Sequence, residues 1–77
     1  MSKQNIQLEL TRDEALVLFE WLARTDAAEV LPIEDAAERH VLWKLEGKLE
    51  SLLDEPLAEN YKSLLAEARR KVRDSGG

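Results

Sequence analysis

The amino-acid sequence predicts a mainly α-helical fold, with a short N-terminal β-strand followed by a three-helix bundle. Three stretches carry apolar residues at three- and four-residue spacing, which places their side chains on one face of a helix. Glycine and proline, which interrupt helices, account for only 3 and 2 of the 77 residues. A chain of this length forms one small domain at most. We therefore expect residues 1–77 to be a single unit with disordered ends at 1–5 and 74–77.

The N-terminal strand is predicted at residues 6–10, where apolar and polar residues alternate strictly. In an extended chain this alternation places Ile6, Leu8 and Leu10 on one face. A strand needs a partner for its backbone groups. The only internal candidate is residues 29–33, where Pro32 cannot donate to a ladder. Pairing within the chain and pairing with another copy both stay open.

The first helix is predicted at about residues 12–25. Thr11 precedes it and Glu14 follows three residues later, the spacing of a reciprocal capping box. Its apolar side chains point almost all round the axis and leave a polar sector of only about 80° at 100° per residue. A surface helix needs one apolar stripe. This helix must therefore be covered on several sides.

The second helix is predicted at residues 38–53, with Asp35 and Glu38 as a weaker capping pair before it. Gly47 falls inside this helix and lowers its propensity by about 1 kcal/mol relative to alanine, unless something packs closely there. Five leucines share one face: Leu42, Leu45, Leu49, Leu52 and Leu53.

The third helix is predicted to begin at Pro56, because proline is well tolerated in the first turn of a helix. The break at residues 54–56 is short, so the second and third helices are expected to form an antiparallel hairpin against which the first helix packs. The third helix has the cleanest apolar stripe of the chain: Leu57, Tyr61, Leu64, Leu65, Ala68 and Val72.

Composition limits the classes of function. The chain has no cysteine, so a disulfide scaffold and a thiolate metal site are excluded. Its net charge is −5, which argues against general attraction to nucleic acid. The longest apolar run, residues 15–19, is far shorter than the roughly 20 residues that span a bilayer. No hydrophobic signal core follows the N-terminus. We expect a cytoplasmic protein.

Catalytic chemistry is not evident in the residue pattern. The single histidine, His40, is not placed by any motif beside a nucleophile, and it is interpreted as an ordinary, partly exposed side chain. The 16 carboxylates are interpreted as a solvated surface, because no inward-facing Glu-x-x-His motif is present. There is no glycine-rich phosphate loop. We therefore expect a non-enzymatic protein without cofactor, metal or small-molecule substrate.

The two tryptophans, Trp21 and Trp43, are the most informative side chains. Both point away from the leucine stripes, so they either cover the edge of the core or form an interface, where tryptophan is enriched. The apolar surplus of the first helix favours a protein–protein interaction module, expected to be a homodimer. The predicted interface residues are Leu18, Trp21, Leu22 and Trp43.

One basic cluster lies near the end of the third helix, at Arg69, Arg70, Lys71 and Arg73. Cations there complement the negative end of the helix dipole and aid solubility, which is the favoured interpretation. The alternative is a small regulatory or antitoxin-like protein that contacts nucleic acid or an acidic partner through this cluster.

Three segments together resemble a group of small bacterial proteins of unknown function. The segments are residues 10–22, LTRDEALVLFEWL; residues 37–46, AERHVLWKLE; and residues 55–61, EPLAENY. The shared features are an EALVLFE-type segment and a VLW-x-LE-type segment. The resemblance implies a small stand-alone bacterial protein, and it implies no activity, cofactor or site residue.

Overall fold

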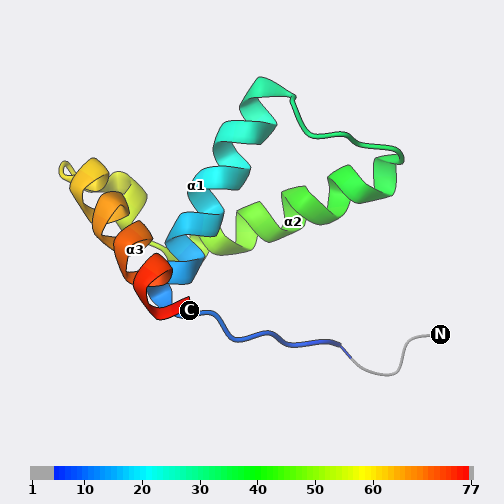
Figure 1. Cartoon of the computed structure of the whole chain (residues 1–77). Helices are drawn as coiled ribbons and strands as arrows, with labels where there is room; N and C mark the ends of the chain where they lie inside the picture. The colour runs from blue at the N-terminus through cyan, green and yellow to red at the C-terminus, as the bar shows by residue number, and fades with distance from the viewer. Residues whose placement is uncertain (1–4, 77) are drawn as a thin grey trace.

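The computed structural model describes residues 5–76 and contains three α-helices: α1 (Arg12–Ala28), α2 (Ala36–Leu52) and α3 (Tyr61–Gly76). A single 3₁₀ turn, η1 (Glu55–Leu57), precedes α3 (Figure 1). No strand occurs within residues 5–76. The prediction of a mainly helical chain with three helices is confirmed.

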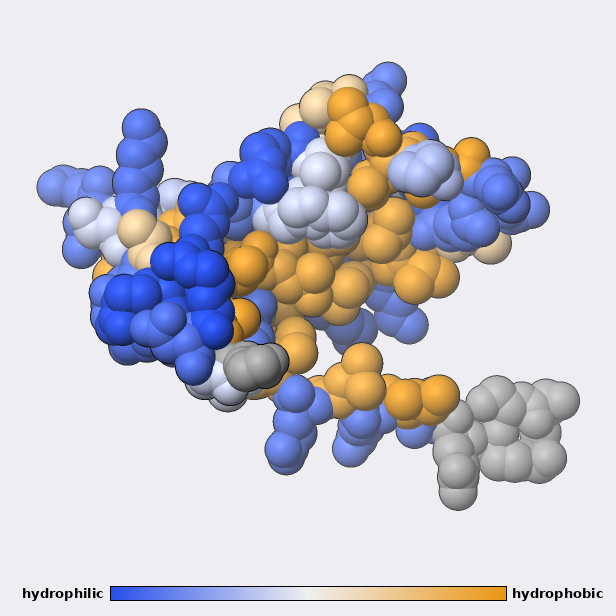
Figure 2. Space-filling view, in the orientation of Figure 1, coloured by the Kyte–Doolittle hydropathy of each residue, from blue (hydrophilic) through white to orange (hydrophobic). Residues whose placement is uncertain are grey.

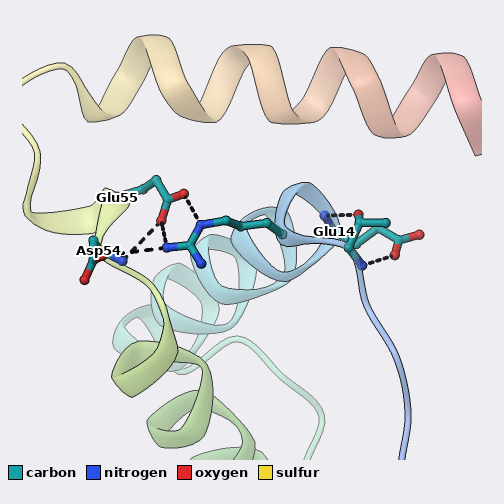
Figure 3. Close-up of polar contacts among 5 residues, drawn as sticks. Glu14, Asp54 and Glu55 are labelled. Carbon is teal, nitrogen blue, oxygen red and sulfur yellow. Dashed lines mark hydrogen bonds and ion pairs between the residues drawn. The ribbon is translucent and has the colours of Figure 1, made fainter.

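Both predicted capping pairs are confirmed, and α2 begins at Ala36, two residues before its predicted start. The Glu14 amide donates to Thr11 Oγ1 at 3.0 Å, and the Thr11 amide donates to Glu14 Oε1 at 2.8 Å (Figure 3). At α2, the Ala37 amide donates to Asp35 Oδ1 at 2.7 Å, while the Asp35 amide donates to the Glu38 carboxylate at 3.3 Å. Each box satisfies backbone donors that a helix start otherwise leaves unpaired.

The end of α1 lies beyond its predicted position because a left-handed residue closes it. Glu29 has a φ of 55° and a ψ of 42°. Its amide donates to the Asp26 carbonyl at 3.1 Å, and the Val30 amide donates to the Thr25 carbonyl at 3.3 Å. This arrangement satisfies the last carbonyls of the helix. The helix therefore extends to Ala28.

The central element is α1, which packs against both α2 and α3. Figure 1 shows α2 and α3 on different sides of α1, and these two helices scarcely touch each other. The predicted antiparallel hairpin of the second and third helices is therefore wrong. Residues 53–60 form a longer connection than expected, with Leu53 and Ala58 both extended. Pro56 lies within η1 rather than at the start of α3, so the chain turns away before the third helix begins.

An ion pair joins the start of α1 to this connection. The Arg12 guanidinium contacts Glu55 through two bonds, Nε to Oε2 at 2.7 Å and Nη2 to Oε1 at 3.1 Å (Figure 3). Asp54 lies 3.9 Å from the same guanidinium. Hydrogen bonding from Arg12 lowers the pKa of the Glu55 carboxyl below its usual value. The contact fixes η1 beside α1.

The predicted N-terminal strand is absent from the described residues. Residues 5–10 form no strand, and the side chains of Ile6 and Leu8 are 89% and 84% exposed. Figure 1 shows this segment extending away from the helices. The internal pairing candidate, residues 29–33, follows the opposite end of α1, a 17-residue helix about 25 Å long. The intervening helix therefore keeps the two segments apart.

The core is small and is centred on α1. Its buried members come from all three helices and from the residue after α2: Leu16, Leu22, Leu49, Leu53, Leu65 and Ala68. Leu52 and Leu57, which the apolar stripes placed with the core, are exposed. Leu52 is exposed because α2 buries only the side that meets α1, and Leu57 is exposed in η1, before α3 begins.

The C-terminal helix is longer than predicted. The last helix continues through residues 74–76, where disorder was expected. Arg70 Nη1 lies 3.1 Å from Asp74 Oδ2, an i,i+4 pair that supports this final turn. The expectation of disorder at residues 1–4 and 77 lies outside the described residues. Over residues 5–76, no helix combines the length and apolar character needed to cross a membrane.

Candidate functional site: the Trp21 face

Trp21 projects from α1 and separates two open grooves. The first, here called the α1–α3 groove, has a volume of about 310 Å³. It is lined by Glu14, Val17, Leu18, Trp21, Arg24, Arg69 and Val72. Its floor is apolar, and its three charged residues supply one carboxylate and two guanidinium groups. The groove therefore combines an apolar contact surface with a mostly cationic edge.

The second, here called the α1–α2 groove, has a volume of about 530 Å³ and reaches the connection between the two helices. It is lined by Trp21, Leu31, Pro32, Ile33, Glu38, Val41 and Leu42. Figure 2 shows hydrophobic atoms gathered on the molecule over α1 and α2. The residues of both grooves together are called the Trp21 face. Trp21 is common to both grooves and lies at the centre of the face.

Helical geometry explains why α1 contributes to both the core and this face. Successive residues turn by about 100°, so Trp21 and Leu22 point in different directions. Leu22 is only 2% exposed, whereas Trp21 is 43% exposed. Val17 and Leu18 lie one turn before Trp21 and are half-buried. The broad apolar surface of α1 is therefore covered on the core side and left open on the Trp21 side.

A polar contact between Tyr61 and Glu20 joins α3 to α1. The Tyr61 hydroxyl, at the start of α3, donates to Glu20 Oε1 on α1 at 2.7 Å. Burial raises the pKa of the Tyr61 phenol above its usual value, and the hydrogen bond to Glu20 adds to this effect. Arg24 Nη1 lies 3.7 Å from the other Glu20 oxygen. These contacts fix α3 against α1 beside the groove.

Trp43 occupies a different environment from Trp21. Its Nε1 donates to Asp26 Oδ1 at 3.1 Å, and the Arg39 guanidinium lies 5.8 Å from the centre of its ring. Arg39 also lies 3.6 Å from Asp26. The His40 ring meets the Trp43 ring edge-on, at 5.8 Å between centroids. Trp43 thus joins the last turn of α1 to α2.

A small enclosed cavity lies behind Trp43. Its volume is about 10 Å³, so it has room for no more than a single water molecule. Glu46 is among its lining residues, and burial, followed by the nearby charges of Asp26 and Glu50, raises the pKa of the Glu46 carboxyl. This cavity is a packing feature between α1 and α2.

The four predicted interface residues therefore separate in the structure. Leu18 and Trp21 lie together in the α1–α3 groove. Leu22 belongs to the core, and this placement removes it from the predicted interface. Trp43 is bound to Asp26 away from both grooves. Other apolar residues of the Trp21 face were visible in the sequence but were not predicted to belong to the interface. They are residues 31–33, Val41 beside the leucine stripe, and Val72.

The predicted basic cluster is partly neutralised by its own helix. Arg70 forms ion pairs with Glu67 and with Asp74. Arg69 is half-buried and lines the α1–α3 groove, while Lys71 and Arg73 are exposed. The cluster therefore does not present four free cations on one surface.

Among residues 5–76, no group of three or more acidic or histidine side chains is arranged to hold a metal ion.

Comparison with known proteins adds no family to this geometry. No protein-family model matches the chain, and searches of curated proteins and of solved structures find no match. The function is therefore argued from the Trp21 face itself.

Proposed function

We propose that the protein is a non-enzymatic interaction module that self-associates through the Trp21 face. The observation that carries this proposal is an open apolar surface on which Trp21 remains 43% exposed between two grooves. Large continuous apolar surfaces are uncommon on monomeric proteins and mark sites of protein contact. Tryptophan is also among the residues most enriched at the energetic centre of interfaces.

The size of the core supports the same proposal. Only six hydrophobic residues of the described chain are buried, and a core of this size supplies about 3 to 5 kcal/mol at most. Packing of the Trp21 face against a second copy increases the buried apolar area without an additional helix or strand. A two-fold dimer requires one self-complementary surface, and the face offers an apolar centre with charges of both signs around it.

The geometry favours this function over contact with nucleic acid through the basic cluster. Glu67 and Asp74 take up the charge of Arg70, and Arg69 is turned toward the α1–α3 groove. The whole chain carries a net charge of −5. A nucleic-acid surface requires an accumulation of free cations along one side.

The test is the solution mass, measured by light scattering across a dilution series. We expect the unmodified chain to have the mass of two chains, and Trp21→Glu to have the mass of one, because a carboxylate cannot be buried at an apolar interface. Leu52→Glu is the matched control. Leu52 is 69% exposed on α2 and lines neither groove, so this variant should remain dimeric.

Circular dichroism of each variant separates loss of association from loss of fold. A helical Trp21→Glu chain with the mass of one copy supports the proposal. A helical Trp21→Glu chain that keeps the mass of two copies contradicts the assigned interface. An unmodified chain that is monomeric at every concentration contradicts self-association.

A further inference from the structure

Residues 5–10 form an extended segment, here called the N-terminal arm, that leaves the helices at the start of α1 (Figure 1). Its apolar side chains, Ile6, Leu8 and Leu10, are 89%, 84% and 46% exposed. Figure 2 shows the hydrophobic atoms of this segment along one side and hydrophilic atoms along the other. The arm is therefore an amphipathic extended segment whose apolar side is largely exposed.

The capping box at α1 directs the arm away from its own groove. Thr11 is extended, with a φ of −65° and a ψ of 162°, and its amide is bound to the Glu14 carboxylate at 2.8 Å. With this cap in place, the arm runs away from the helices rather than back along α1 (Figure 1). The arm is consequently better placed to reach a second molecule than the α1–α3 groove beside its own helix.

The arm and the α1–α3 groove match in length and in character. Six extended residues span about 20 Å. The groove follows α1 from Glu14 to Arg24, about 15 Å at 1.5 Å per residue. Its floor is apolar, as is one side of the arm. Arg69, which lines the groove, is opposite in charge to Glu9, the only charged residue of the arm.

We propose that two copies exchange their N-terminal arms, so that the arm of each copy lies in the α1–α3 groove of the other. Leu8 and Leu10 pack against Val17, Trp21 and Val72, and Glu9, on the opposite, polar side of the arm, lies at the solvent-facing rim of the groove near Arg69. The proposal rests on self-association through the Trp21 face and deepens it, because it names the segment that fills the groove. Arm exchange also uses the apolar residues that find no strand partner within residues 5–76.

The absence of cysteine from the chain allows a site-specific crosslinking test. A Leu8→Cys chain and a tagged Val72→Cys chain are mixed, left to exchange subunits and oxidised. We expect a disulfide between the two different chains. A mixture of Leu8→Cys with Leu52→Cys is the control, because Leu52 is apolar and more exposed than Val72 but lies outside the groove. That mixture should give little crosslink.

A second variant measures the contribution of the arm to association. Leu8→Ser should raise the dimer dissociation constant about tenfold or more, because the dimer loses one buried leucine in each groove. Gln7→Ser is its control, since Gln7 lies on the polar side of the arm and should leave the dissociation constant nearly unchanged. Equal affinities for the unmodified and Leu8→Ser chains would overturn the exchange.

The outcomes distinguish arm exchange from self-association itself. A dimer without the Leu8–Val72 crosslink, or with Leu8→Cys chains joined to each other, overturns the exchange and leaves the proposed function standing. A Leu8→Cys/Val72→Cys double variant that closes its disulfide within one chain also overturns it, because the arm then covers its own groove. An unmodified chain that is monomeric throughout the dilution series overturns both proposals.

Discussion

Trp21 and Trp43 have nearly the same exposed fraction, 43% and 48%, yet the structure places them in different chemical environments. Trp43 donates to Asp26 and packs beside Arg39 and His40, so its ring joins two helices of the same chain. Trp21 lies between two open apolar grooves. The difference shows that exposure alone does not identify an interface residue. What surrounds the ring separates a residue that completes the fold from one that is available to a partner.

The same contrast occurs within α1 between two consecutive residues. Leu22 is almost completely buried, and Trp21 is the centre of the Trp21 face. Substitution at position 22 should therefore change the stability of the fold, whereas substitution at position 21 should change association. The surroundings of Trp43 allow the same comparison between fold and interface.

Leu22→Ala should have the largest effect on folding. Removing a fully buried leucine costs about 2 to 5 kcal/mol, because the apolar contacts are lost and a cavity remains. That cost is comparable with the whole stability expected of so small a core, so the variant should be largely unfolded. Denaturation followed by circular dichroism measures it. An unchanged unfolding midpoint would show that Leu22 is not a core residue.

The second largest effect is expected at alkaline pH, which should weaken the contact between α1 and α3 at Tyr61 and Glu20. The pKa of Tyr61 is raised in the folded chain and is about 10 in the unfolded chain. The folded state therefore holds the phenolic proton more tightly. Its stabilising effect is complete below about pH 10 and is lost as pH rises toward the folded-state pKa. Ionisation would also place a tyrosinate against the Glu20 carboxylate.

The measurement is the unfolding midpoint of the unmodified chain and of Tyr61→Phe from about pH 9 to about pH 11. Tyr61→Phe should be less stable by about 1 to 1.5 kcal/mol at neutral pH, which is the usual net contribution of one hydrogen bond. It should also lack the part of the alkaline decline that Tyr61 causes. Parallel declines in the two chains would contradict a role for the Tyr61–Glu20 contact.

Gly47→Ala should stabilise the chain by about 1 kcal/mol, because alanine has the higher helix propensity. Gly47 lies one turn after Trp43 in α2, and, apart from its chain neighbours and the backbone of its own helix, a Cβ built there meets no atom of the described chain within 4 Å. Solution mass should stay unchanged if this outer side of α2 is free. A more stable chain with weaker association would instead place a partner against Gly47 and move the interface toward Trp43.

Trp43→Phe should have the smallest effect. It removes the hydrogen bond to Asp26 and keeps an aromatic ring beside Arg39 and His40. The bond is exposed, so its loss should cost about 0.5 kcal/mol, the lower end of the range for hydrogen bonds. Thermal unfolding measures this change, and light scattering should find no change in mass. A loss of association would show that Trp43 belongs to the interface after all.

The candidate site was only partly predictable from sequence. Apolar surplus and helical spacing led to Leu18 and Trp21, because these properties are carried by α1 alone. The same reasoning included Leu22, since a helix with apolar residues on nearly every side does not indicate which side its neighbours will cover. Val72 and Val41 entered the face only when α3 and α2 took their places beside α1.

The sequence by itself determined the local structure of this protein. Thr11 with Glu14, and Asp35 with Glu38, define two helix starts, because capping depends on residues within one turn of each other. The tertiary structure alone decided that α1 lies between α2 and α3 and that residues 5–10 have no strand partner in the described part of the chain. These outcomes depend on distances between segments far apart in the chain. The 17-residue length of α1 and the extended backbone at Ala58 set those distances. A local sequence pattern does not determine them.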